Sequence, residues 1–179
     1  MDLQSLYQKA INFAGEKHAN QKITGSESSY LVHLSNVAME ILLASQHRHD
    51  FDVNFAVQVA LLHDVIEDTP TSFEEIKSVF GFQIADAVLA LSKNPDLNPE
   101  ERIPDSLARI RLQPKEVWAV KLADRITNMQ EPPAHWDKNK RIAYQVAARM
   151  ILMQLKDANH YLEQRLEDKI LAYDAYIES

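Results

Sequence analysis

Three groups of polar residues interrupt otherwise apolar stretches of this sequence. They are His33 in the segment YLVH, the run His63-Asp64-Val65-Ile66-Glu67-Asp68, and Asp124, Arg125 and Asn128 in LADRITN. Burying such side chains without partners costs several kcal/mol each, so we expect the three groups to share one partner. Imidazole and carboxylate groups are the ligands open to a chain without cysteine, and they suit first-row divalent ions such as manganese, iron, zinc or cobalt. The residue types therefore predict a metal site.

The spacing around His63 shows how one segment can supply both ligands and a base. Adjacent residues on a helix point about 100° apart, so His63 and Asp64 reach the same ion only near a helix end. Pro70 follows shortly after and is consistent with such an end. Because Glu67 and Asp68 lie one turn further on, all four side chains can line one cavity, with the second pair free to handle protons.

Each group taken alone also has a structural interpretation. A single histidine on an apolar helix, such as His33, is more often a hydrogen-bonded core residue than a ligand, and an adjacent His and Asp are common by chance. The ordered combination of three groups, each set against an apolar helical run, favours the metal site. We interpret the other histidines as surface or structural residues: His18, His47, His49, His135 and His160.

The surrounding sequence predicts helices that would position these groups. Apolar residues recur at intervals of three and four, as on one face of an amphipathic helix. The helices expected are 3–17, 31–46, 53–66 as a central buried helix, 72–81, 84–91, 114–130, and 138–179 as one helix or two joined near 157–159. Residues 93–99 contain two prolines and are expected to form a loop.

Composition narrows the class of protein. The chain has 179 residues, the usual size of one domain, and only three glycines, which favours helices over an all-β fold. A net charge of −7 argues against nucleic-acid binding. The absence of cysteine, of an N-terminal signal segment and of a long apolar run predicts a cytoplasmic protein that does not bind a membrane.

The motifs extend over nearly the whole chain. In order they are KHANQK at 17–22, YLVH at 30–33, ALLHDVIEDT at 60–69, FG at 80–81, VKLADRITNM at 120–129 and WDKNKRIAY at 136–144. Together they resemble the HD superfamily of metal-dependent phosphohydrolases. Within it they are most similar to the alarmone hydrolase branch, which comprises the hydrolase domain of RelA/SpoT proteins and the small alarmone hydrolases of the Mesh1 type.

This resemblance implies an all-α, single-domain HD-type helical bundle over residues 1–179. It also implies hydrolytic removal of the 3′-pyrophosphate from guanosine tetra- or pentaphosphate, (p)ppGpp, with Mn²⁺ or another divalent transition metal as cofactor. The residues that match the family's metal ligands are His33, His63, Asp64 and Asp124. Glu67 and Asp68 would orient or deprotonate the attacking water, and Asn128 would hold the ligand near the metal.

Cations must hold the distal end of the substrate, since the acidic residues around the metal would repel a polyphosphate. The candidates are Lys17, Lys22, Arg125, Lys140 and Arg141. By the resemblance, Lys140 and Tyr144 would face the nucleotide. The expected partner is thus a small purine nucleotide rather than nucleic acid, and the sequence leaves the oligomeric state open.

The chain departs from the family pattern before its first metal ligand. Ile23 stands where the family usually has an arginine that stacks on guanine, and Ser29 and Leu34 replace two prolines. Adenosine analogues, (p)ppApp, are therefore possible substrates. Two alternatives stay open: a related phosphohydrolase, for instance one that releases the 2′-phosphate of NADPH, and a non-catalytic HD domain that binds a nucleotide.

Overall fold

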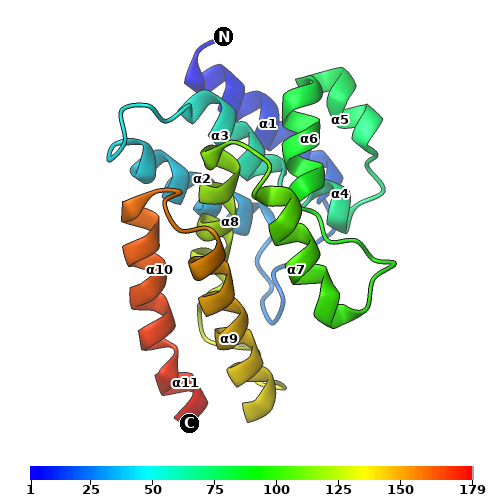
Figure 1. Cartoon of the computed structure of the whole chain (residues 1–179). Coiled ribbons are helices and arrows are strands. Elements are labelled where there is room, and N and C mark those ends of the chain that lie inside the picture. The colour runs from blue at the N-terminus through cyan, green and yellow to red at the C-terminus, as the bar shows by residue number, and fades with distance from the viewer. Residues whose placement is uncertain (179) are drawn as a thin grey trace.

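The computed structural model describes residues 1–178, which form an all-α structure, as predicted (Figure 1). The helices are α1 (Leu3–Lys17), α2 (Leu31–Ser45), α3 (Val53–Leu62), α4 (Val65–Asp68), α5 (Phe73–Phe80), α6 (Phe82–Leu91), α7 (Pro99–Ile110), α8 (Lys115–Asn128), α9 (Lys138–Gln154), α10 (His160–Ala172) and α11 (Asp174–Glu178). The described residues contain no β-strand, and one isolated bridge pairs Lys22 with Ser29 in the loop between α1 and α2. The N-terminus and α11 lie at opposite ends of the molecule (Figure 1).

Helices α3 and α8 form the centre of the core. Helix α3 packs against α1, α2 and α8, and α8 also packs against α2 and α10. From Ala119 to Ile126 every side chain of α8 is buried, including Lys121, Asp124 and Arg125. A helix with charged side chains in its buried part needs partners for them from neighbouring elements, and these partners form the site described below.

Side chains before the helices explain where several of them begin. Asp52, Ser72, Asp137 and Asn159 each accept a hydrogen bond from a backbone N–H in the first turn of α3, α5, α9 and α10. Such caps satisfy amide groups that have no partner within the helix. Pro114 occupies the N-cap position directly before the first turn of α8.

The central helix ends earlier than the sequence predicts. Helix α3 stops at Leu62 rather than Ile66, and His63 and Asp64 form a turn before the short helix α4. This break matters for the site. Two adjacent side chains of a continuous helix diverge, but in the turn the backbone changes direction and both can point to the same place.

The loop expected at residues 93–99 is only partly correct, because helix α7 already begins at Pro99. Proline fits the first helical position, since its missing N–H would have no partner there. Asn98 and Glu101 exchange hydrogen bonds in a capping box. At the C-terminal end, the segment predicted as one helix or two joined near 157–159 forms three helices, α9, α10 and α11. The break at 155–159, where Asp157 has a φ of 70°, agrees with the second alternative, whereas the break before α11 was not predicted. Ser179 lies outside the described residues.

Across residues 1–178, no helix combines the length and the apolar character that a membrane crossing requires.

Replacing Asn159 with alanine is expected to destabilise the protein more than removal of an exposed cap. The buried Asn159 amide caps α10 at Leu162 N and also donates to Ala44 O at 3.1 Å. Losing the cap costs about 1 kcal/mol. Losing the buried hydrogen bond to Ala44 O, which still accepts from His47 N, adds about 0.5–1.5 kcal/mol. Urea unfolding measures the difference. Asp137→Ala, which removes only an exposed cap on α9, is the control; equal losses would contradict the role of the Ala44 contact.

Candidate metal centre

Ligand atoms of His33, His63 and Asp64 lie within 4.8 Å of one another, which is the spacing of a metal-binding set. His33 comes from the first turn of α2, and His63 and Asp64 come from the turn after α3. The two Nε2 atoms are 3.4 Å apart. Asp64 Oδ2 is 2.9 Å from His63 Nε2 and 3.7 Å from His33 Nε2. Both imidazoles are buried, so the set forms one compact, sheltered group.

Asp124 approaches the same point from α8. Its Oδ1 lies 3.5 Å from His33 Nε2 and 3.7 Å from His63 Nε2. Its Oδ2 accepts from Lys121 Nζ at 2.9 Å, and Oδ1 accepts from Asn128 Nδ2 at 2.6 Å. One carboxylate oxygen therefore faces the imidazoles while the other is held by a lysine of the same helix. All four predicted ligands lie together, drawn from three parts of the chain.

Neighbouring groups fix the orientation of these side chains. His63 Nδ1 lies 2.7 Å from the carbonyl oxygen of Ala60 and donates to it, which turns Nε2 toward Asp64. Tyr30 donates its hydroxyl proton to Asp64 Oδ2 at 2.5 Å. A histidine that donates one ring N–H to a carbonyl and presents the other nitrogen is the usual arrangement of a metal ligand. The donor set, two imidazoles and two carboxylates, fits a divalent transition ion.

The pKa values of the histidines and carboxylates indicate which of these groups carries a proton in the absence of metal. Burial by itself lowers the pKa of His63, but the charges and hydrogen bonds of Asp64 and Asp124 raise it to about 10. Burial and the neighbouring His63 lower the pKa of His33. Burial alone would raise the pKa of Asp124, yet Lys121 and the imidazoles hold it well below its usual range. Without metal, an imidazolium at His63 thus partly balances the carboxylates.

The acidic pair on α4 lies beside this set, and each member has a different partner. Glu67 is held by Lys93, whose Nζ and backbone N–H both donate to its carboxylate. Asp68 Oδ2 accepts from Gln21 Nε2 at 2.8 Å. Burial, with the charges of Asp64 and Glu67, raises the pKa of Asp68 despite the Gln21 hydrogen bond. A raised pKa is the direction needed for proton transfer near neutral pH.

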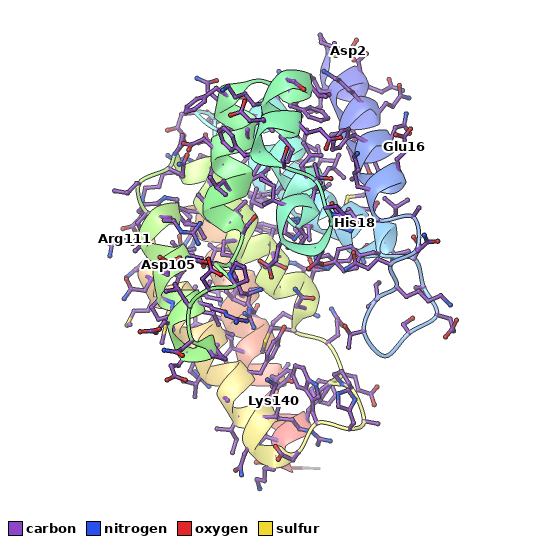
Figure 2. All side chains as sticks on the ribbon, turned by 90° about the vertical axis from the view of Figure 1, so that its right-hand side faces the viewer. Asp2, Glu16, His18, Asp105, Arg111 and Lys140 are labelled. Atoms are coloured by element: carbon purple, nitrogen blue, oxygen red, sulfur yellow. The ribbon has the colours of Figure 1, made fainter. Side chains whose placement is uncertain are left out.

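The predicted substrate cations do not all gather here. Lys17 pairs with Glu75 at 2.6 Å, and the exposed Lys22 pairs with Glu27 within the α1–α2 loop. Lys140 is exposed, 5.5 Å from the centre of the Trp136 ring. Figure 2 shows Lys140 toward the lower end of the molecule, far from His18 at the end of α1. These three lysines are thus peripheral to the group formed by His33, His63, Asp64 and Asp124, which we call the metal set.

Arg125 and Tyr144 do lie together, next to Asp124 and Asn128. The guanidinium of Arg125 is buried and its central carbon lies 4.4 Å from the centre of the Tyr144 ring. Within residues 1–178 its Nε and Nη1 have no hydrogen-bond partner. A buried cation with unused donors is costly and is suited to an anionic ligand. Of the substrate residues predicted, Arg125, Asn128 and Tyr144 are the ones that the fold groups near the metal set.

Sequence reasoning missed three residues that shape the site: Gln21, Lys93 and Lys121. The signal for Lys121 was available, since it lies three residues before Asp124 on one helix, where side chains are neighbours. Gln21 lies in the KHANQK motif, and His18 holds its amide at 2.6 Å. Lys93 has no local signal, because its contact with Glu67 joins segments that are distant in sequence.

Comparisons with known proteins agree with this geometry. A family model described as HD domain matches residues 10–149. The chain is 32% identical over 168 residues to the guanosine-3′,5′-bis(diphosphate) 3′-pyrophosphohydrolase MESH1 of Danio rerio, covering 91% of each chain. It is 33% identical over 144 residues to the guanosine-3′,5′-bis(diphosphate) 3′-pyrophosphohydrolase of Aquifex aeolicus, covering 76% of this chain and 19% of that protein.

Similarity extends to a solved structure, that of a metazoan ortholog of SpoT that hydrolyses ppGpp and plays a role in starvation responses. The two structures superimpose with a TM-score of 0.83 at 26% identity, and the match covers 96% of each chain. The likeness therefore extends over almost the whole fold.

Binding of a divalent ion to the metal-free protein at about pH 8 is expected to release close to one proton. The ion must displace the proton of His63, whose pKa is about 10, while His33 is already neutral. Calorimetric titration with Mn²⁺ in two buffers of different ionisation enthalpy measures the release. In the control Asp64→Asn, the lost charge lowers the pKa of His63, so proton release and affinity should fall together. Binding of the wild type without proton release would contradict this protonation state.

Proposed function

Because the chain belongs to the HD-domain family, and within it to the family of the MESH1-type 3′-pyrophosphohydrolases, we propose that it is a metal-dependent hydrolase. Its substrate would be guanosine 3′,5′-bis(diphosphate) or a close analogue, from which it removes the 3′-pyrophosphate. The observation that carries this proposal is the convergence of two buried imidazoles and two carboxylates from three parts of the chain, beside a separate acidic pair.

His33, His63, Asp64 and Asp124 would hold the metal ion, and we propose Mn²⁺ among the divalent ions that such ligands accept. A bound divalent ion lowers the pKa of water from 15.7 toward about 7 and withdraws charge from phosphoryl oxygens. Lys121 and Asn128 would keep Asp124 in place as a ligand, and Tyr30 would do the same for Asp64.

The acidic pair would handle the proton of the attacking water. Asp68 has one oxygen engaged by Gln21 and a pKa raised by burial, so it is suited to accept a proton near neutral pH. Glu67, held on both oxygens by Lys93, would orient the water rather than take its proton. Both side chains come from the single turn of α4, which places them next to the ligand Asp64.

The substrate would contact the group formed by Arg125, Asn128 and Tyr144. The unpaired donors of Arg125 suit a phosphate, and Tyr144 offers an aromatic face. Lys17 and Lys22 would serve the distal phosphates, and Lys140, on α9 with Tyr144, would face the nucleotide. The Lys22–Glu27 pair is exposed and the Lys17–Glu75 pair is partly exposed. Ion pairs in contact with solvent contribute only about 0–1 kcal/mol, so a polyphosphate could displace the two glutamates. A cytoplasmic location and the small purine nucleotide as partner belong to this proposal.

Adenosine analogues are the second candidate substrates, and Ile23 is the observation that favours them. Ile23 is partly buried in the α1–α2 loop and occupies the place of the family's stacking arginine. An aliphatic side chain contacts either purine and does not provide a planar cation for guanine. The base preference of this chain should therefore be weaker than that of a relative that has the arginine.

Pyrophosphate release from ppGpp is expected with Mn²⁺ and not after chelation. Asp64→Asn should lower turnover more than about 100-fold, since even residues that only support ligands cost 10–100-fold when changed. Steady-state assays of ppGpp, ppApp and NADPH side by side measure this. Lys77→Met, which removes an exposed lysine paired with Glu74, is the control and should keep full activity. Absence of pyrophosphate release from both alarmones would refute the proposal, and phosphate release from NADPH alone would replace it.

Ile23→Arg is expected to raise the preference for the guanine substrate. A guanidinium stacked on a base contributes about 0.5–1 kcal/mol, which corresponds to a two- to five-fold gain in kcat/KM for ppGpp relative to ppApp. The matched control is Ile23→Lys, which adds the charge without the planar group and should improve both substrates alike. If both variants shift the preference equally, charge rather than stacking acts at this position.

A further inference from the structure

Lys93 holds the carboxylate of Glu67 by two bonds from a single residue. Its ammonium Nζ donates to Oε1 at 2.5 Å, and its backbone N–H donates to Oε2 at 2.8 Å. Both oxygens of Glu67 are thus engaged from one side, whereas Asp68 is held by one side-chain amide. The Glu67 side chain is only 22% exposed, so this contact differs from the loose ion pairs of the surface.

The backbone that carries Lys93 is itself tied down. Lys93 follows directly on Ser92, the C-cap of α6, whose Oγ donates to Val88 O at 2.8 Å. Arg109 of α7 donates to the carbonyl oxygens of Ser92 and Leu89 at 2.7 and 2.6 Å. The end of α6 is therefore fixed by α7, and Lys93 reaches Glu67 from a rigid base rather than from a free loop.

The charge of Lys93 also acts on the metal set. Burial by itself lowers the pKa of Lys93, but the charges of Glu67, Asp124 and Asp64 raise it above its ordinary value. A positive charge is thus held where three carboxylates lie close together. Since the negative charges of these carboxylates would repel a polyphosphate, a fixed cation beside them offsets part of that repulsion.

We propose that Lys93 is a positioning residue of the hydrolytic site, which holds Glu67 in one orientation through its ammonium and its backbone amide. Glu67 then acts as a fixed acceptor for the attacking water, and Asp68 keeps an oxygen free for the proton. This proposal rests on the proposed function for its kinetic consequence. The placement of Glu67 itself does not depend on that function or on a bound metal.

The first arm of the test uses the metal-free protein. Because Lys93 N–H donates to Glu67, the exchange of this amide with deuterium should be slow in the wild type and faster in Glu67→Ala. In Lys93→Met the backbone bond remains possible, but the carboxylate loses the ammonium, so exchange of residue 93 should rise to an intermediate rate. If the rate at residue 93 is the same in all three proteins, the contact does not hold Glu67 and the proposal fails.

The second arm measures turnover of ppGpp. Lys93→Met should lower kcat about 10–100-fold, the usual effect of losing a residue that supports a site, with a smaller change in KM and unchanged Mn²⁺ affinity. Lys93→Arg should recover most of the rate. The double variant Lys93→Met/Glu67→Gln should be no slower than Glu67→Gln alone, since each change disrupts the same contact between Lys93 and the Glu67 carboxylate. Lys77→Met, an exposed lysine that pairs with Glu74, is the matched control.

Three results would each overturn the proposal. They are a wild-type rate in Lys93→Met, a loss of rate that weaker Mn²⁺ binding explains, and a double variant whose loss is the product of the two single losses. A wild-type chain that hydrolyses none of the nucleotides would count against the proposed function alone. In that case the amide exchange at residue 93 still decides whether Lys93 positions Glu67.

Discussion

The site depends on one buried carboxylate, that of Asp124 at the centre of α8. A charged group in this environment is stable only when its surroundings supply hydrogen bonds and opposite charge. Lys121 and Asn128 do so from the same helix, and the imidazoles of His33 and His63 do so from α2 and the α3–α4 turn. The side chains that stabilise Asp124 therefore include the two imidazoles that we propose as metal ligands. The packing of α8 and the geometry of the proposed metal site thus depend on the same contacts.

The elements around α8 position the other side chains of the site. The break after Leu62 lets His63 and Asp64 point to one spot, and the single turn of α4 carries the acidic pair beside them. The loops after α1 and α6 each send one residue to that pair, Gln21 to Asp68 and Lys93 to Glu67. Each of these carboxylates is thus paired with a hydrogen-bond donor, which lowers the density of negative charge in the site.

The sequence predicted mainly those features that depend on residues close together in the chain. Apolar spacing gave the bounds of α1 closely and located α2 and α8, and three motifs singled out the four side chains that the fold brings together. Helix α7 was missed because its two prolines argue against a helix: Pro99 is compatible with the first helical position, but Pro104 lies inside the helix. The end of α3 was misplaced because the apolar run continues past Leu62. The partners of Glu67 and Arg125 depend on tertiary packing, so no short window of sequence contains them.

The separation of the ligands along the chain has a consequence for how the protein reaches its native state. His33 lies in the first quarter of the sequence, whereas Asp124 lies beyond its middle, and their helices α2 and α8 pack against each other in the folded structure. Contacts between distant segments form late, since closing long loops costs entropy before it is repaid. During synthesis, an emerging N-terminal half would contain both imidazoles and Asp64 but not Asp124, so the four-residue group is complete only once α8 has been made.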